Sequence, residues 1–256
     1  TGKTRLSREL KDLISPKDVD SEVEYQSKVL YYNAFTEDLF YWDNDLYADT
    51  DRKLLIQPNN FTDLILEFLK EQGLDNNIVT NFQHFTNDSI TPLFNEEYTI
   101  QDENGNDIII KAYSEVKFSL ASGDNQSLSN IKISKGEESN FVWCVFYSLI
   151  EQVVELHTIE DLDERFSDKF NHIEYIFIDD PISSLDENHL IELAVNLANL
   201  VKKSMNLNFI ISTHNPLFYN VLYNELGLGK KKGTFMLIKN EDNKFSLDSK
   251  GGDSNK

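Results

Sequence analysis

Apolar residues recur at helical spacing in several stretches of the chain. The pattern predicts helices over residues 5–14, 61–70 and 77–85, and a longer helix that begins at residue 134. On one face of the first lie Leu6, Leu10, Leu13 and Ile14, and the last shows Phe141, Val145, Leu149, Ile150, Val153 and Val154 near this spacing. A helix with one apolar face is expected to pack that face against a core.

Other stretches have the composition of strands. Residues 175–178 and 208–212 are apolar runs rich in aromatic and β-branched residues, which is typical of buried strands in a parallel sheet. Strands are also expected around residues 98–100 and over residues 108–118, and the turn before the second contains Asn104-Gly105, a hairpin signal. These patterns predict an α/β fold with a mainly parallel core sheet and a mixed α/β insertion.

Two carboxylates follow the run 175–178 directly. Asp179 and Asp180 would lie at the carboxyl edge of a parallel sheet, where open α/β sheets bind ligands. Mg²⁺ prefers one or two protein oxygen ligands together with phosphate oxygens and water, so Asp179 is a candidate metal ligand. Asp180 is a candidate for orienting or deprotonating an attacking water. A pair of ordinary solvated acids is the plainer interpretation, which the following Ser183-Ser184-Leu185-Asp186 makes much less favourable.

The chain starts with the end of a phosphate-binding motif. Gly2, Lys3 and Thr4 match the last three residues of GxxxxGK[ST], in which the lysine reaches the terminal phosphate and the hydroxyl binds Mg²⁺. The helix predicted over residues 5–14 follows as the motif requires. Since the first half of the motif would precede Thr1, we expect the chain to be part of a longer protein.

The long helix predicted from residue 134 starts with a capping pattern. Ser134 and Glu137 have the spacing of a capping box, in which the two side chains satisfy each other's backbone N–H groups. Free amides and the positive end of the helix dipole make such an end suitable for a phosphate. Ser134, Gly136 and Glu137 are therefore candidate nucleotide-binding residues, and a well-capped core helix is the plainer interpretation.

A histidine follows the second apolar run. His214 lies just beyond residues 208–212, where an imidazole could reach a γ-phosphate and respond to its presence. Pro216 keeps the preceding Asn215 out of a helix. His84, His157, His172 and His189 lack the spacing of metal ligands and are given no role.

In this order the four motifs resemble an ABC-type ATPase head. The stretches 30–42, 135–141 and 178–186 are more specifically similar to the nucleotide-binding domain of bacterial PrrC-type anticodon nucleases, and the likeness runs along most of the chain. That family joins such a domain to a C-terminal ribonuclease that cuts tRNA in the anticodon loop, as a latent toxin guarded by a restriction-modification system. The resemblance implies a P-loop fold, Mg²⁺ with ATP or GTP, and a homodimer or higher oligomer that regulates the nuclease in antiviral defence. Its expected partners are tRNA, through the C-terminal domain, and restriction-modification proteins.

The resemblance also assigns roles to the motif residues. It implies that Asp179 and Thr4 hold the metal, that Asp180 is the catalytic carboxylate and that His214 is the switch histidine. Gly2, Lys3 and Thr4 would bind the phosphates of one copy. The signature residues Ser134, Gly136 and Glu137 would dock on the nucleotide held by the other copy, and Asp186 would lie at the dimer contact.

One departure from the ABC-type pattern leaves two alternatives open. The second carboxylate is Asp180 where most such enzymes carry glutamate, so turnover is expected to be slow, which suits a switch. A nucleotide-gated interaction module without significant turnover is therefore one alternative. The other is a DNA-maintenance ATPase of the SMC or RecF kind, although residues 41–128 lack the long heptad arms of SMC proteins.

Composition narrows the function classes. The net charge of −20 argues against this domain as the main RNA-binding surface, because such surfaces neutralise phosphates with Lys and Arg. Cys144 is the single cysteine, so no disulfide can form within the chain, which fits the reducing cytoplasm. The longest apolar run, residues 141–150, is shorter than the roughly 20 residues of a membrane span. We therefore expect a cytoplasmic protein without a membrane segment.

The order of the predicted elements suggests a core with one insertion. Residues 1–40 and 130–248 are expected to form the nucleotide-binding core, and residues 41–129 an insertion lobe. Residues 249–256 contain Gly251-Gly252 and are expected to be a linker to a C-terminal nuclease domain.

Overall fold

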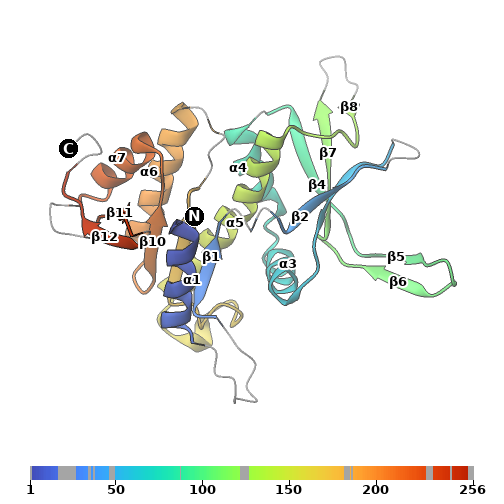
Figure 1. The fold of residues 1–256 in the computed structure, drawn as a ribbon. Coiled ribbons are helices and arrows are strands. Elements are labelled where there is room, and N and C mark those ends of the chain that lie inside the picture. The colour runs from blue at the N-terminus through green and yellow to red at the C-terminus, as the bar shows by residue number, and fades with distance from the viewer. Residues whose placement is uncertain are drawn as a thin grey trace. The chain divides into compact units, whose positions relative to one another are not determined.

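The computed structural model divides the chain into two compact units. Residues 1–33 and 150–256 form the first unit, and residues 34–149 form the second. In Figure 1 the first unit is dark blue at its start and yellow to red over its later part, whereas the second runs from light blue to green. The structure describes residues 2–16, 27–33, 36, 38–45, 50–86, 88–121, 127–181, 185, 187–228, 233–242 and 244–252.

A three-stranded parallel sheet is central to the first unit. Its order is β1 (Val29–Tyr32), β9 (Tyr175–Asp179) and β10 (Asn208–Ser212). The two apolar runs of the sequence are thus adjacent strands, and their parallel pairing extends from Tyr175 and Asn208 to Asp179 and Ser212. The predicted α/β class with a parallel core sheet is confirmed.

Strand β10 is less buried than its composition predicts. Residues 209–211 are half-buried, whereas Ile176, Phe177 and Ile178 of β9 are at most 1% exposed. Among the described strands, β10 pairs with β9 alone and therefore lies at the edge of this sheet. The prediction of a second buried strand is wrong, because apolar composition does not distinguish a central strand from an edge strand.

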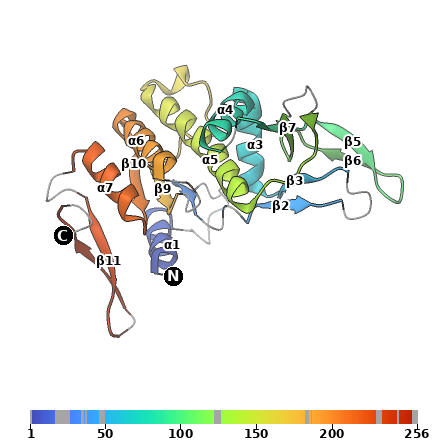
Figure 2. The same cartoon turned by 90° about the horizontal axis from the view of Figure 1, so that it is seen from above.

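Helices and a hairpin complete the first unit. Helix α1 (Gly2–Ile14) packs against β9 and β11, and α6 (Glu187–Lys203) packs against α7 (Pro216–Glu225). Strands β11 (Phe235–Lys239) and β12 (Phe245–Ser249) form an antiparallel hairpin, seen beside α7 in Figure 2. The first predicted helix is confirmed, but Leu13 is 80% exposed, so its packed face is narrower than predicted.

An antiparallel sheet and the helices α3, α4 and α5 make up most of the described part of the second unit. The sheet order is β2 (Phe40–Asp43), β3 (Lys53–Ile56), β7 (Glu115–Ala121) and β4 (Ile90–Phe94), with the short β8 (Ser127–Leu128) also paired with β7. Helices α3 (Asn60–Gln72) and α4 (Asp75–Phe85) confirm the two predicted helical regions. Helix α5 (Lys135–Thr158) is shared, since residues 135–149 belong to this unit and residues 150–158 to the first. A 3₁₀ turn, η1 (Leu162–Glu164), follows α5.

Phe141 of α5 lies at the centre of an aromatic core in the second unit. Its ring centroid is 5.2 Å from that of Phe118, 5.8 Å from Phe82, 5.9 Å from Phe94 and 6.4 Å from Phe40. Aromatic pairs at such distances contribute about 0.5–1.5 kcal/mol each beyond the area they bury. This core holds the first turns of α5 against the sheet and α4.

Helix α3 begins with a reciprocal cap. Asn59 Oδ1 accepts the N–H groups of Phe61 and Thr62, both at 3.0 Å, and Thr62 Oγ1 accepts the Asn59 N–H at 2.9 Å. We expect Asn59→Ala to lower the free energy of unfolding by about 1 kcal/mol, because two N–H groups lose their acceptor. Urea denaturation measures this, with Asn77→Ala on the exposed face of α4 as the control. Equal midpoints for the two variants would contradict the expectation.

The predicted Asn-Gly hairpin is present, but the strand after it is broken. Strands β5 (Tyr98–Gln101) and β6 (Asp107–Ile110) pair antiparallel across Gly105, whose φ of 80° suits glycine. The single strand expected over residues 108–118 is instead β6 and β7. Between them the chain turns at Tyr113, which has a φ of 65°, and no glycine or proline marks this turn in the sequence.

Several other expectations concern burial and the chain's ends. Cys144 is fully buried. No helix among the described residues has the combined length and apolarity of a membrane span. Strand β12 includes Ser249, the first residue of the predicted linker, and residues 253–256 lie outside the described residues. The predicted domain boundaries at residues 40 and 130 stay predictions.

Candidate active site

The first predicted acid lies where two parallel strands end together. Asp179 is the last residue of β9 and is paired in register with Ser212, the last residue of β10. The Ser212 hydroxyl donates a hydrogen bond to Asp179 Oδ1 at 2.5 Å. Asp179 is only 9% exposed, so this residue is largely buried. The carboxyl edge of this sheet therefore carries a carboxylate with a hydroxyl beside it.

The second acid occupies an unusual backbone conformation. Asp180 has a φ of 58°, in the left-handed region that few residues other than glycine adopt, with Asp and Asn the commonest exceptions. Its N–H donates to the Ser212 carbonyl oxygen at 2.7 Å. The left-handed residue bends the chain at the end of β9. Consecutive side chains point to opposite faces of a strand, yet here the Asp179 side chain contacts Ser212 and the Asp180 side chain contacts Thr213 and His214, the next residues of the chain.

The Asp180 carboxylate holds the residues that follow β10. Its Oδ1 accepts the Thr213 hydroxyl at 3.3 Å and the His214 N–H at 3.2 Å. Its Oδ2 contacts Nδ1 of the His214 ring. An imidazole whose Nδ1–H binds a carboxylate has its other nitrogen, Nε2, on the side of the ring away from that carboxylate. The His214 side chain is 66% exposed and that of Asp180 29%, so the pair lies at the surface.

The N-terminal cap of α7 fixes the other end of the loop that follows β10. Asn215 Oδ1 accepts the N–H groups of Leu217 and Phe218 at 2.9 and 3.1 Å, and Pro216 is the first residue of α7. The Asn215 N–H donates to the Thr213 hydroxyl at 3.0 Å. Asn215 has an extended backbone and precedes the helix, which confirms the prediction that Pro216 keeps it out of a helix. Residues 212–214 are thus held between β9 and the start of α7, which gives His214 a defined place.

The capping box predicted at the start of α5 is present in the second unit. The Ser134 N–H donates to Glu137 Oε2 at 2.7 Å, and the Glu137 N–H donates to the Ser134 hydroxyl at 3.3 Å. The Ser134 side chain is exposed, whereas Gly136 and Glu137 are half-buried. Glu137 therefore shapes the start of the helix through its bond to the Ser134 backbone.

A buried glutamate links this helix start to β2. The Glu138 side chain is 7% exposed. It accepts the indole N–H of Trp42 at 2.8 Å and the Lys135 ammonium at 2.5 Å. No motif in the sequence marks Trp42 or Glu138 as a candidate site residue. Nothing in their spacing marks the contact, because they are far apart in the sequence and come together only through the packing of β2 on α5.

The structure brings some of the predicted site residues together. Asp179, Asp180 and His214 form one cluster with Ser212 and Thr213, called here the β9–β10 cluster. Ser134, Gly136 and Glu137 lie in the second unit. Gly2, Lys3 and Thr4 begin α1, but their side chains lie outside what the structure describes, and so does all of Asp186.

The oxygen donors of the cluster fit the chemistry of Mg²⁺. The described residues include no group of three or more His, Cys, Asp or Glu side chains placed to bind a metal. Mg²⁺ that binds together with a nucleotide needs only one or two protein oxygens, since phosphates and water supply the rest. The carboxylate of Asp179 meets this requirement, with Thr4 as the second candidate.

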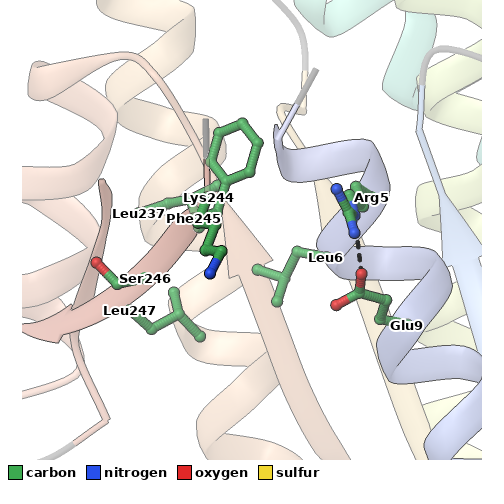
Figure 3. Close-up of a pocket in the computed structure, with 8 residues that line it drawn as sticks. All are labelled: Arg5, Leu6, Glu9, Leu237, Lys244, Phe245, Ser246 and Leu247. Carbon is green, nitrogen blue, oxygen red and sulfur yellow. Dashed lines mark hydrogen bonds and ion pairs between the residues drawn. The ribbon is translucent and has the colours of Figure 1, made fainter. Parts of the chain in front are cut away.

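A separate cavity lies in the first unit between α1 and the β11–β12 hairpin. Figure 3 shows its lining, which encloses about 460 Å³. Leu6 of α1 faces apolar residues of the hairpin, and the Arg5 guanidinium pairs with Glu9 at 2.9 Å. The other lining residues are Leu237, Lys244, Phe245, Ser246 and Leu247. None of these residues belongs to the β9–β10 cluster.

Comparisons with known proteins place these features in context. A family model described as an AAA domain matches residues 112–255. A curated protein of Escherichia coli named "Anticodon nuclease" is 51% identical over 265 aligned residues, which cover 100% of this chain and 62% of that protein. The chain therefore spans less than two thirds of this relative. The resemblance to anticodon nucleases that the motifs predict is confirmed.

Matches among solved structures include one described by SMC ATPases and one by an Smc head domain. One, described under ATP-driven dimerization and DNA-stimulated activation of SMC ATPases, has a TM-score of 0.40 and 10% identity, covering 73% of this chain and 89% of that one. The Smc head domain with a coiled coil and joint from Pyrococcus yayanosii has a TM-score of 0.37 and 10% identity, covering 70% of this chain and 26% of that one.

Proposed function

The chain belongs to the AAA domain family, and on this premise we propose that it binds and hydrolyses ATP or GTP in the presence of Mg²⁺. The observation that carries the proposal is the β9–β10 cluster, in which two consecutive carboxylates at the carboxyl edge of a parallel sheet bind the end of the next strand. That edge is where sheets of this class bind ligands.

In this proposal Asp179 and Thr4 hold the metal. Asp179 offers a hard carboxylate ligand, and its bond from the Ser212 hydroxyl orients that carboxylate. The Thr4 hydroxyl is the second ligand, and Gly2 and Lys3 bind the phosphates. When bound, the metal neutralises negative charge on the transferring phosphoryl group.

Asp180 and His214 then act as a pair on the γ-phosphate side. The carboxylate fixes the His214 ring through Nδ1, so Nε2 is the nitrogen that contacts the terminal phosphate. Asp180 also orients the attacking water and takes its proton. In the structure its oxygens accept bonds from Thr213 and His214, so Asp180 must share its carboxylate between His214 and water during turnover. This requirement agrees with the slow hydrolysis expected for an aspartate at this position.

A specific observation supports a second candidate function, a nucleotide-gated interaction module. Each Asp180 oxygen already contacts a donor within the protein. A carboxylate held in this way can position His214 for nucleotide sensing without serving as a base. In that case nucleotide binding alone would change the assembly of the protein.

We propose further that two copies share each nucleotide. Ser134 and Gly136 at the start of α5 contact the γ-phosphate held by the other copy, Glu137 supports this contact by fixing the Ser134 backbone, and Asp186 lies at the dimer contact. The capping box supports this assignment, because it gives α5 a defined N-terminus with an exposed serine. A helix N-terminus favours phosphate through its amides and dipole.

The nucleotide-driven step is proposed to control an anticodon nuclease. Support comes from the 51% identity to the Escherichia coli protein of that name, of which the chain covers 62%. In this proposal tRNA is the substrate of the remaining part of the full-length protein, and restriction-modification proteins keep the nuclease inactive. The cytoplasm is the proposed compartment.

The metal assignment is tested with Asp179→Asn in the full-length protein. We expect the variant to release phosphate from ATP and GTP at least about tenfold more slowly at limiting Mg²⁺, because a neutral amide is a weaker ligand than a carboxylate. Asp248→Asn, which removes an exposed acid from β12, is the control. Titration of Mg²⁺ against phosphate release measures the effect. Identical Mg²⁺ curves for the wild type and Asp179→Asn would exclude Asp179 as the metal ligand.

A further inference from the structure

The β5–β6 hairpin of the second unit has one apolar face. Tyr98 pairs with Ile110 and Ile100 pairs with Ile108 across the two strands. Cross-strand partners lie on the same side of a hairpin, so these four residues form one surface, called here the hairpin face. Thr99, Gln101, Asp107 and Ile109 lie on the opposite side.

The hairpin face is open to solvent. Tyr98, Ile100 and Ile108 are 38%, 43% and 42% exposed. Among the described strands, β5 and β6 pair only with each other. In Figures 1 and 2 the hairpin extends away from the β2-β3-β7-β4 sheet of its own unit. A two-stranded hairpin with neither face covered is marginally stable in water, so this one depends on its attachment.

A buried ion pair anchors the β5 side of the hairpin's base. The Tyr98 hydroxyl donates to Glu115 Oε2 at 2.9 Å, and Glu115 Oε1 binds the Lys53 ammonium at 2.7 Å. The Lys53 and Glu115 side chains are 15% and 9% exposed. Because the pair is shielded from water, it fixes the position of Tyr98 on β7 and β3.

The β6 side is anchored as well. Asn95 Nδ2 donates to the Lys111 carbonyl oxygen at 2.8 Å, and Asn95 Oδ1 accepts the Glu115 N–H at 2.8 Å. The Lys111 ammonium binds Asp63 of α3 at 3.0 Å. The hairpin is thus held at both strands of its base, while Ile100 and Ile108 beyond the base are exposed to solvent.

The charge around the hairpin face selects the kind of partner. Residues 96–110 include Glu96, Glu97, Asp102, Glu103 and Asp107 and contain no Lys or Arg. A nucleic acid would be repelled by these carboxylates, and a second copy would bring the same charges against them. A protein surface with basic residues around an apolar strip is complementary to both the charge and the apolar side chains.

We propose that the hairpin face is the docking surface for a second protein, which presents an apolar strip flanked by Lys or Arg residues. The apolar strip covers Ile100 and Ile108, and the basic residues pair with the acids at the tip and at the base. None of the four residues of the hairpin face belongs to the nucleotide site proposed above.

Two labelled peptides test the proposal on the full-length protein. One alternates Val and Thr between pairs of lysines, and the other carries glutamates in place of the lysines. Binding is measured by fluorescence anisotropy for wild type, for the double variant Ile100→Thr with Ile108→Thr, and for Ile109→Thr on the opposite side. Threonine suits an exposed strand, so the hairpin is retained. We expect the lysine peptide to bind wild type and Ile109→Thr at least about tenfold more tightly than the double variant.

Other results would overturn the proposal. Equal binding of the lysine peptide to all three proteins would mean that net charge alone attracts it. Binding of the glutamate peptide as tightly as the lysine peptide would remove the charge complementarity. A concentration-dependent dimer that sedimentation detects in wild type and Ile109→Thr, but not in the double variant, would assign the face to a second copy. Loss of labelled tRNA binding in the double variant alone would assign it to RNA.

Discussion

Full-length protein with Asp180→Asn is expected to hydrolyse its nucleoside triphosphate about 10²–10⁴-fold more slowly than wild type, the range that a positioned general base supplies. Asparagine keeps the shape of the side chain but cannot take a proton from water. It also tolerates the left-handed backbone that Asp180 adopts, with its φ of 58°, so the loop should keep its form. Nucleotide binding is expected to persist because Gly2, Lys3, Thr4 and Asp179 are unchanged.

Single-turnover phosphate release and equilibrium binding of a labelled nucleotide separate the two effects. Asp102→Asn is a matched control, because the Asp102 carboxylate also accepts backbone and side-chain N–H groups, from Asn104 and Asn106, in an exposed turn. Its hydrolysis rate should equal that of wild type. A hydrolysis rate of Asp180→Asn equal to that of wild type would remove the catalytic role of Asp180. If both proteins bind nucleotide and neither hydrolyses it significantly, the interaction module is favoured.

Ser134→Arg is expected to abolish nucleotide-dependent dimers. In the proposed shared site the Ser134 hydroxyl approaches the γ-phosphate of the other copy, and an arginine side chain there would fill the space that the phosphate needs. The exposed position of Ser134 in the structure means that arginine fits on the isolated subunit. The loss should therefore appear in assembly, with only a small change in folding stability from the lost cap, about 1 kcal/mol.

The solution mass of the full-length protein with Mg²⁺, measured with and without a non-hydrolysable nucleotide, tests this expectation. Ser134→Ala and Asn59→Ala form a matched pair, because each removes one side chain of a capping box, at α5 and α3 respectively. Only the change at α5 should weaken the dimer. If Ser134→Arg leaves the mass unchanged, the trans contact of the signature is wrong, and if Asn59→Ala acts like Ser134→Ala, capping alone explains the result.

Local signals in the sequence accounted for much of the fold. The capping box at Ser134 and Glu137, the non-helical backbone of Asn215 before Pro216 and the hairpin at Gly105 each depend on residues within a few positions of one another. Such local chemistry is readable from a single chain because the partners are fixed by spacing. The strand at residues 175–178 was also correct, since a continuous apolar run of that length has few alternatives.

The features of the fold and of the site that could not be predicted from the sequence depend on long-range packing. Edge strand β10 and central strand β9 have similar composition, so their difference in burial comes from the number of neighbouring strands. The turn at Tyr113 has no glycine or proline to mark it, and the Tyr113 N–H donates to the carbonyl oxygen of Asn95, which follows β4. In the candidate site, the bond between Asp180 and His214 was not predicted, because it follows from the register of β9 with β10 and from the left-handed backbone at Asp180.

The hydrogen bond between Trp42 and Glu138 makes the fluorescence of Trp42 a reporter of the start of α5. This chain has two tryptophans, and Trp143 of α5 is fully buried. The Trp42 indole is half-buried and donates to Glu138 next to the signature residues. Indole fluorescence depends on hydrogen bonding and solvent contact. Trp42 is therefore an intrinsic fluorophore that is hydrogen-bonded to Glu138, the residue after Glu137. In this chain with Trp143 replaced by Phe, the Trp42 signal would follow the start of α5 in real time and without a label.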